Sequence, residues 1–170
     1  MKATKIMMFV AAAAMLFASC GKDELDLENN QLRYDGTVYN MTSSASTDAQ
    51  SSYVSFGAVG REVLFSLNGQ FEDAAFNRTF NLAVAAEDVH YYIDFFSEAL
   101  TLNFSYDNNR GTFHGGMEGV QEGESIFTEG SCSITYDNNG LEVTLDGTLK
   151  NGKELAFKVF VPKDEIRSMN

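Results

Sequence analysis

Few residues in this chain have the types and spacings that catalysis or metal binding requires. His90 and His114 are the only histidines among the 170 residues, and neither has the spacing of a metal-binding pair or a nearby cysteine pair. Cys132 lies in the alternating segment 131–134 with no histidine close in sequence, so we expect a small buried residue rather than a nucleophile. The sequence therefore predicts no catalytic residue, no metal site and no cofactor.

Several acidic segments offer oxygen atoms without the pattern of a known site. Residues 107–109 read Asp-Asn-Asn and residues 137–142 read Asp-Asn-Asn-Gly-Leu-Glu, which are ligand types that calcium accepts. Both lack the twelve-residue loop with a terminal bidentate glutamate, and turn formation accounts for the same residues. A glycan hydrolase would need two carboxylates that face each other in space, and sequence alone does not reveal such a pair.

Cys20 has the most specific chemistry because of what precedes it. Two lysines near the start are followed by an apolar run over residues 6–17 and then by Ala18-Ser19-Cys20, the order of a secretory signal peptide. The run is shorter than the roughly 20 residues that a membrane-spanning helix needs. Ala18-Ser19-Cys20 resembles a lipobox, which implies a signal peptide over residues 1–19 and lipid attachment at Cys20. The alternative is an ordinary cleaved signal with a chance cysteine.

The segment after Cys20 is short and acidic, and we interpret residues 20–31 as a tether. Removal of residues 1–19 changes the formal net charge from −12 to −14, since two lysines leave and no acidic residue does. Such a charge repels nucleic acid and bare anionic membrane surfaces. We therefore expect no nucleic-acid partner, and contact with the membrane through the N-terminal lipid only.

The rest of the chain, residues 32–170, is expected to form a single β-domain. Apolar and polar residues alternate with a period of two over most of it, for example over residues 100–106 and 155–161, which is typical of half-buried strands. Residues 41–52 are rich in Ser, Thr and Ala and predict a surface loop. Tight turns are predicted by four short motifs: Asp35-Gly36, Asn68-Gly69, Asn139-Gly140 and Asn151-Gly152.

Residues 88–96 fit either a helical face or a strand face, and their aromatic and β-branched content favours a strand. In a strand, one residue of each adjacent aromatic pair must point away from the core. Tyr92 and Phe96 are therefore the candidates for contact with a sugar ring or a partner protein. The alternative, which the sequence favours, is that both faces of the strand are buried between sheet and loop.

These elements predict an all-β fold. We expect an antiparallel two-sheet β-sandwich of about nine or ten short strands, with a lipocalin-like or flattened β-barrel as the alternative. The 14 phenylalanines and 7 tyrosines are sufficient for an aromatic core in either architecture.

The acidic tether, the segments 34–39 and 127–131, and the hairpin motifs at Asn139-Gly140 and Asn151-Gly152 together carry a family resemblance. The chain is similar to small uncharacterised surface lipoproteins of Bacteroidetes. This resemblance implies attachment to the outer membrane, with exposure on the cell surface favoured over the periplasmic leaflet. It implies no catalytic residue.

Three functions remain open on the sequence. The leading hypothesis is a lipid-anchored, non-enzymatic protein with a binding or structural accessory role, whose glycan or protein partner is unknown. The alternative is a lipocalin-like carrier of a small apolar ligand, which would need an interior cavity of roughly 300 Å³ or more. A glycan hydrolase is the least favoured.

Overall fold

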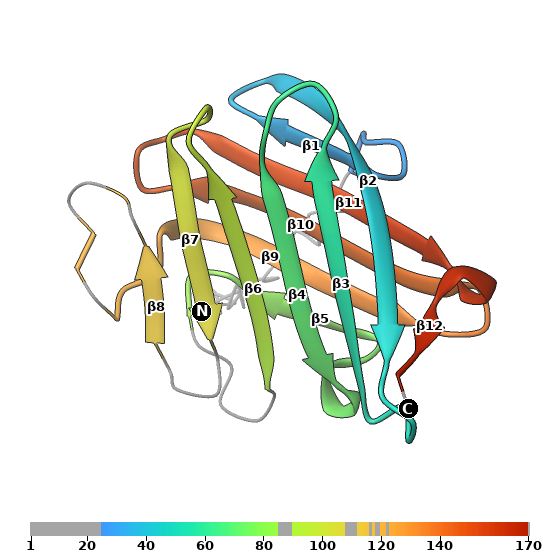
Figure 1. Ribbon diagram of the computed structural model, residues 1–170. Helices are drawn as coiled ribbons and strands as arrows, with labels where there is room; N and C mark the ends of the chain where they lie inside the picture. The colour runs from blue at the N-terminus through green and yellow to red at the C-terminus, as the bar shows by residue number, and fades with distance from the viewer. Residues whose placement is uncertain are drawn as a thin grey trace, which may run out of the picture.

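The computed structural model describes residues 25–84, 90–107, 112–115, 117, 120, 121 and 123–169, and nearly all of their regular structure is β-strand (Figure 1). The prediction of an all-β fold is confirmed. The strands of the described residues are β1 (Gln31–Tyr34), β2 (Thr37–Thr47), β3 (Tyr53–Gly60), β4 (Ser66–Glu72), β5 (Arg78–Asn81), β6 (Tyr91–Ser97), β7 (Leu102–Asp107), β8 (Thr112–Gly115), β9 (Phe127–Tyr136), β10 (Gly140–Leu149), β11 (Glu154–Pro162) and β12 (Arg167–Ser168).

All of these strands belong to one continuous, curled sheet. Its order is β5-β9-β10-β11-β1-β2-β3-β4-β6-β7-β8, with antiparallel neighbours throughout, and β12 adds to β2 in parallel. Figure 1 shows the sheet curling so that β9, β10 and β11 lie behind β2, β3, β4 and β6 and cross them. The architecture is a half-barrel with two facing layers, which lies between the predicted sandwich and its barrel alternative.

Three of the four predicted turns form. Asn139-Gly140 lies where β9 turns into β10, and the other two have the backbone angles that their residue types favour. Asp35 and Gly36 have φ angles of 49° and 78° and connect β1 to β2, whose register pairs Tyr34 with Thr37. Positive φ at both central residues matches the right-handed twist of the flanking strands. Gly152, with φ 80°, lies in the turn between β10 and β11.

The prediction of a loop over residues 41–52 is wrong for its first half. Strand β2 continues to Thr47 and pairs with β3 over residues 41–47. Met41, Ala45 and Thr47 are buried, while Thr42 and Ser44 between them are exposed. The alternation is hard to recognise in the sequence because most of the inward residues are small or weakly apolar. Whether such a segment forms a strand depends on its pairing within the whole sheet.

The predicted turn at Asn68-Gly69 is also wrong, because both residues lie inside β4. Gly69 faces the core, where a Cβ atom would lie 2.2 Å from Cε1 of Phe56. The Phe56 ring stacks on Phe71 with centroids 5.9 Å apart. This glycine is therefore explained by the close approach of an aromatic ring and not by a positive φ angle.

The ambiguous segment is a strand over residues 91–97, as favoured; residues 88 and 89 lie outside the described residues. Its burial alternates, so that Tyr91, Ile93 and Phe95 are buried while Phe96 is exposed. In and after β5, Phe80 and Leu82 are buried, whereas 59% of Val84 is exposed.

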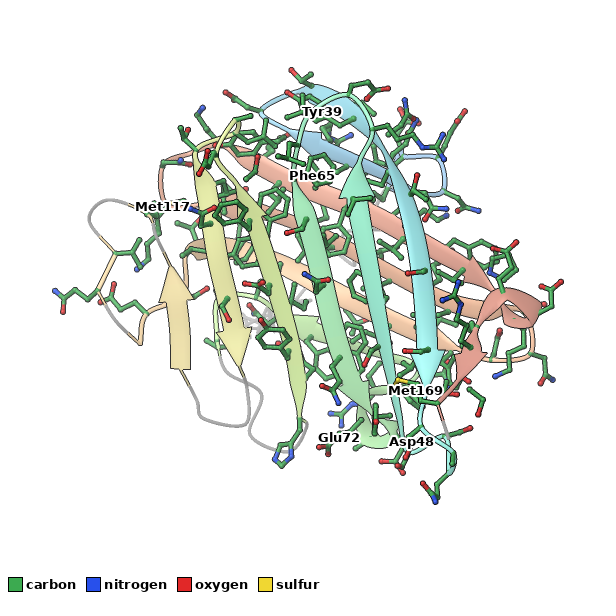
Figure 2. The ribbon with its side chains drawn as sticks, viewed as in Figure 1. Tyr39, Asp48, Phe65, Glu72, Met117 and Met169 are labelled. Atoms are coloured by element: carbon green, nitrogen blue, oxygen red, sulfur yellow. The ribbon has the colours of Figure 1, made fainter. Side chains whose placement is uncertain are left out.

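Aromatic side chains fill the space between the two layers. Phe80 of β5 stacks on Tyr91 of β6 with centroids 4.9 Å apart, and Phe104 of β7 meets Phe127 of β9 edge-on at 5.7 Å. Both contacts join strands that are far apart in the sheet order. At one end of the molecule, the Tyr39 and Phe65 rings lie edge to face at 6.3 Å (Figure 2).

Phe95 and Phe96 provide a test of this arrangement, because they are adjacent in β6 and face opposite sides. Phe95 is 1% exposed and Phe96 is 48% exposed. We expect Phe95→Ala to lower the free energy of unfolding by about 3–5 kcal/mol, because it leaves a cavity among stacked rings. Phe96→Ala should lower it by about 1 kcal/mol or less. Equal losses in urea unfolding of the two variants would contradict the register of β6.

Candidate functional site

The candidate site is the outward surface of β2, β3, β4, β6 and β7. The two predicted contact residues, Tyr92 and Phe96, both lie on it, with Tyr92 half-buried and Phe96 exposed. The sequence favours the alternative that both faces of this strand are buried. That prediction is wrong for Phe96, which is exposed. The predicted lipid-attachment residue Cys20 lies outside the described residues.

The register of these strands aligns the outward side chains in three rows across the sheet. The first row has Thr42, Val59, Ser66, Phe96 and Asn103; the second has Ser44, Gly57, Asn68, Asp94 and Ser105; the third has Ser46, Ser55, Gln70 and Tyr92. We call these fourteen residues the polar face. Neighbouring strands lie about 4.8 Å apart, so each row presents a side chain at that interval.

The polar face is nearly free of charge. Asp94 is the one carboxylate among the fourteen residues, which include no lysine or arginine. Two further acidic residues lie at the margin of the face: Asp107, which pairs with Tyr92, and Glu72 at the end of β4. The outward side of the other layer is different: Lys158 of β11 pairs with Glu142 of β10 at 3.4 Å, and Asp146 and Glu154 are exposed nearby. Charged side chains are the ordinary covering of a wet sheet face, so the composition of the polar face requires another explanation.

Five of the polar side chains of this face have unused hydrogen-bonding capacity. Within the described part of the chain, the side chains of Ser44, Ser46, Ser55, Asn68 and Gln70 make no hydrogen bond to another protein group. Thr42 and Asn103, in the first row, are engaged: Thr42 accepts from Arg61 at 3.0 Å and Asn103 from the Ser97 amide at 3.0 Å. The second and third rows therefore offer unused hydroxyl and amide groups.

A groove of about 380 Å³ hollows one end of the polar face. Ser44, Ser46, Ser55 and Gly57 line it from the face itself. The other wall is the C-terminal segment, where Arg167 and Met169 stand beside β2. The Met169 amide donates to the Thr47 carbonyl at 2.8 Å, and Figure 2 shows Met169 at the end of β2. Strand β12 thus forms a rim along the polar face.

A smaller hollow of about 80 Å³ lies at the far end of the third row. Gln70, Glu72, His90 and Tyr92 contribute to its lining. His90 is exposed, and its Nδ1 lies 3.4 Å from Oε2 of Glu72, an ion pair only when the imidazole is protonated.

Asp94 occupies the second row between Asn68 and Ser105, and its surroundings alter its titration. Partial burial raises the pKa of Asp94 above its ordinary value of 3.8, and a hydrogen bond from the Tyr92 side chain acts in the opposite direction. The net direction is upward. The face therefore holds its one carboxylate in a less solvated setting than an exposed aspartate would have.

The polar face offers hydroxyl and amide groups, one carboxylate and a few apolar side chains. No cluster of three or more His, Cys, Asp or Glu side chains suited to a metal occurs in the part of the chain that the structure describes. Among those same residues, no helix is long and apolar enough to cross a membrane. Cys132 is buried in β9, as expected for a small core residue.

The sequence does not predict the groove, because the composition of residues 41–52 favours a loop and therefore gives no direction to Ser44 and Ser46. The signal was present as a period-two pattern in which Met41, Ser43, Ala45 and Thr47 face inward. The contribution of Arg167 and Met169 had no such signal, because it depends on the chain returning to β2 after β11.

The chain matches no family model, no curated protein and no solved structure in comparisons with known proteins. A functional assignment therefore rests on the geometry of the polar face and on the N-terminal sequence.

The raised pKa of Asp94 has a consequence for stability. A carboxyl group with a raised pKa holds its proton more tightly when folded, so the ionised form costs stability once the pH exceeds the folded pKa. This loss of stability is absent at pH values well below 3.8, the ordinary pKa of the group. It grows as the pH rises from that value through the raised pKa of the folded state. We expect Asp94→Asn to raise the melting temperature relative to the unmodified chain more at pH 7 than at pH 3. An equal difference at both pH values in thermal scans would contradict this assignment.

Proposed function

We propose that this chain is a lipid-anchored, cell-surface β-protein with a non-enzymatic binding role, and that the polar face is its binding surface. The observation that carries the proposal is a continuous, nearly uncharged face with unengaged Asn68 and Gln70 side chains and an adjoining groove of about 380 Å³. The groove supplies a hollow beside the face, and the unengaged amide groups supply placed polar groups of the kind that orient a ligand in a binding site.

The packing of the interior supports external binding over the carriage of an apolar ligand. Rings of Phe65, Phe95 and Phe104 stack in series with centroids 5.7 and 5.8 Å apart, and Phe127 continues the contact into the other layer. Close-packed rings occupy the volume that a carrier would keep open for its ligand. The groove opens on the outside of the sheet instead.

The proposed anchor rests on the N-terminal sequence. The lysines, the apolar run and Ala18-Ser19-Cys20 resemble a lipoprotein signal, and an acidic tether separates Cys20 from the first strand. A lipid at Cys20 would attach the acidic body to a membrane without any contact between the protein surface and lipid headgroups. The resemblance to Bacteroidetes surface lipoproteins favours the outer leaflet of the outer membrane.

Cys20→Ala tests the anchor. Without the thiol no thioether to lipid can form, so we expect the variant to leave the membrane fraction and appear in the soluble fraction. The measurement is fractionation of expressing cells, with Cys132→Ser as the matched control because Cys132 is buried in the core. A Cys20→Ala variant that remains with membranes as fully as the unmodified chain would refute lipid anchoring.

Surface exposure is tested by protease treatment of intact cells, combined with mass analysis of the N-terminal peptide. We expect a lipid-modified Cys20 and loss of the folded body from treated cells, because a protein on the outer face is accessible to the enzyme. A lipid-modified chain that stays intact on sealed cells would show that the protein faces the periplasm, against the surface location.

A further inference from the structure

We propose that the polar face binds an uncharged glycan chain, which lies across the strands from the groove beside β12 to Phe96 on β6. This inference rests on the proposed binding role and names the class of ligand. Its grounds are the chemistry of the face, its direction and the charge of the protein.

The first argument is the match between side chains and sugars. A sugar ring presents hydroxyl groups around its edge and C–H groups on its faces. The second and third rows offer hydroxyl and amide groups that both donate and accept hydrogen bonds, namely those of Ser44, Ser46, Ser55, Asn68 and Gln70. Phe96, with 48% of its surface exposed, offers an apolar ring against which C–H groups can stack.

The second argument is extent. The second and third rows cross from β2 to β6 through three strand intervals, about 14 Å in all. This distance exceeds the width of one sugar ring, so the rows suit several linked sugars. Gly57 keeps the surface low in the second row, because it has no side chain between Ser44 and Asn68.

The third argument is charge. The sequence carries a formal net charge of −12, which opposes the approach of polyanionic glycans. The polar face contains no basic residue; Arg61 and Arg167 stand at its margins, where Arg61 is hydrogen-bonded to Thr42. A neutral chain meets no such opposition.

A protein partner fits the face less well. Protein interfaces are centred on desolvated apolar and aromatic residues and are depleted in serine. The polar face has five serines, and its exposed apolar residues Val59 and Phe96 are separated by Ser66 within one row. A face of this kind lacks the continuous apolar centre that a protein partner or a second copy of the chain would bury.

The test is affinity electrophoresis of the detergent-solubilised full chain through native gels that contain one polysaccharide each. The neutral probes are β-glucan, xylan, mannan and galactan, and the acidic probe is polygalacturonan. We expect at least one neutral probe to retard the protein. Phe96→Ala and Gln70→Ala should each weaken that retention about three- to tenfold in dissociation constant, with unchanged circular dichroism and melting behaviour showing that the variants remain folded.

Phe160→Ala is the matched control, because Phe160 is a half-buried aromatic residue that points outward from β11 on the other layer. It should be retarded as strongly as the unmodified chain. Absence of retardation by every neutral probe would overturn the inference, as would retention that Phe96→Ala and Gln70→Ala leave unchanged. Retardation by polygalacturonan alone would also overturn it and would point to Arg167.

Failure of this inference is separable from failure of the proposed function. Lipid attachment at Cys20 and accessibility on intact cells do not depend on the glycan. If both hold while no neutral probe is retained, only the ligand class is wrong. If Cys20 carries no lipid, the anchored role fails whatever the gels show. A self-associated state that Phe96→Ala dissolves would replace the glycan with a second copy of the chain.

Discussion

The contact of aromatic rings between the two layers is the constraint on which the rest of the structure depends. Among the described residues, strands β5 and β8 end the sheet order and are not paired with each other, so no ladder of backbone hydrogen bonds between these two strands closes the curl. Contacts such as Phe80 with Tyr91 and Phe104 with Phe127 hold the two halves of the sheet together. These contacts remove large apolar surfaces from water, and that burial is the main favourable term in folding.

The same packing determines which side chains are left for function. Because successive residues of a strand point to opposite faces, burial of Tyr91, Ile93 and Phe95 directs Tyr92, Asp94 and Phe96 outward. The inward residues must be apolar to fill the core. The outward residues are not constrained by packing in the core. A covering of serine, asparagine and glutamine on the outward side contributes little to the stability of the core.

The two outer surfaces of one sheet therefore differ in their chemistry. The surface over β10 and β11 carries paired charges such as Lys158 with Glu142, which suit a face that stays in water. The surface over β2, β3, β4, β6 and β7 carries mainly neutral hydrogen-bonding groups, with Asp94 among them, beside a groove. In a lipid-anchored protein, such asymmetry would let one side meet a ligand while the acidic remainder of the molecule keeps it soluble and apart from its neighbours.

The sequence by itself determined the all-β class and the Asp35-Gly36 and Asn151-Gly152 turns, because these follow from local geometry and a period of two. The exposure of Phe96 was decided by the tertiary structure, because nothing covers this side of β6 among the described residues. Only the tertiary structure decided that residues 41–47 belong to a strand, that Gly69 lies beneath the Phe56 ring, and that the sheet curls into one half-barrel. It also brought Arg167 and Met169 beside Ser44 and Ser46 to form the groove. Those features depend on pairing and packing between residues distant in the chain, and no local pattern contains that information.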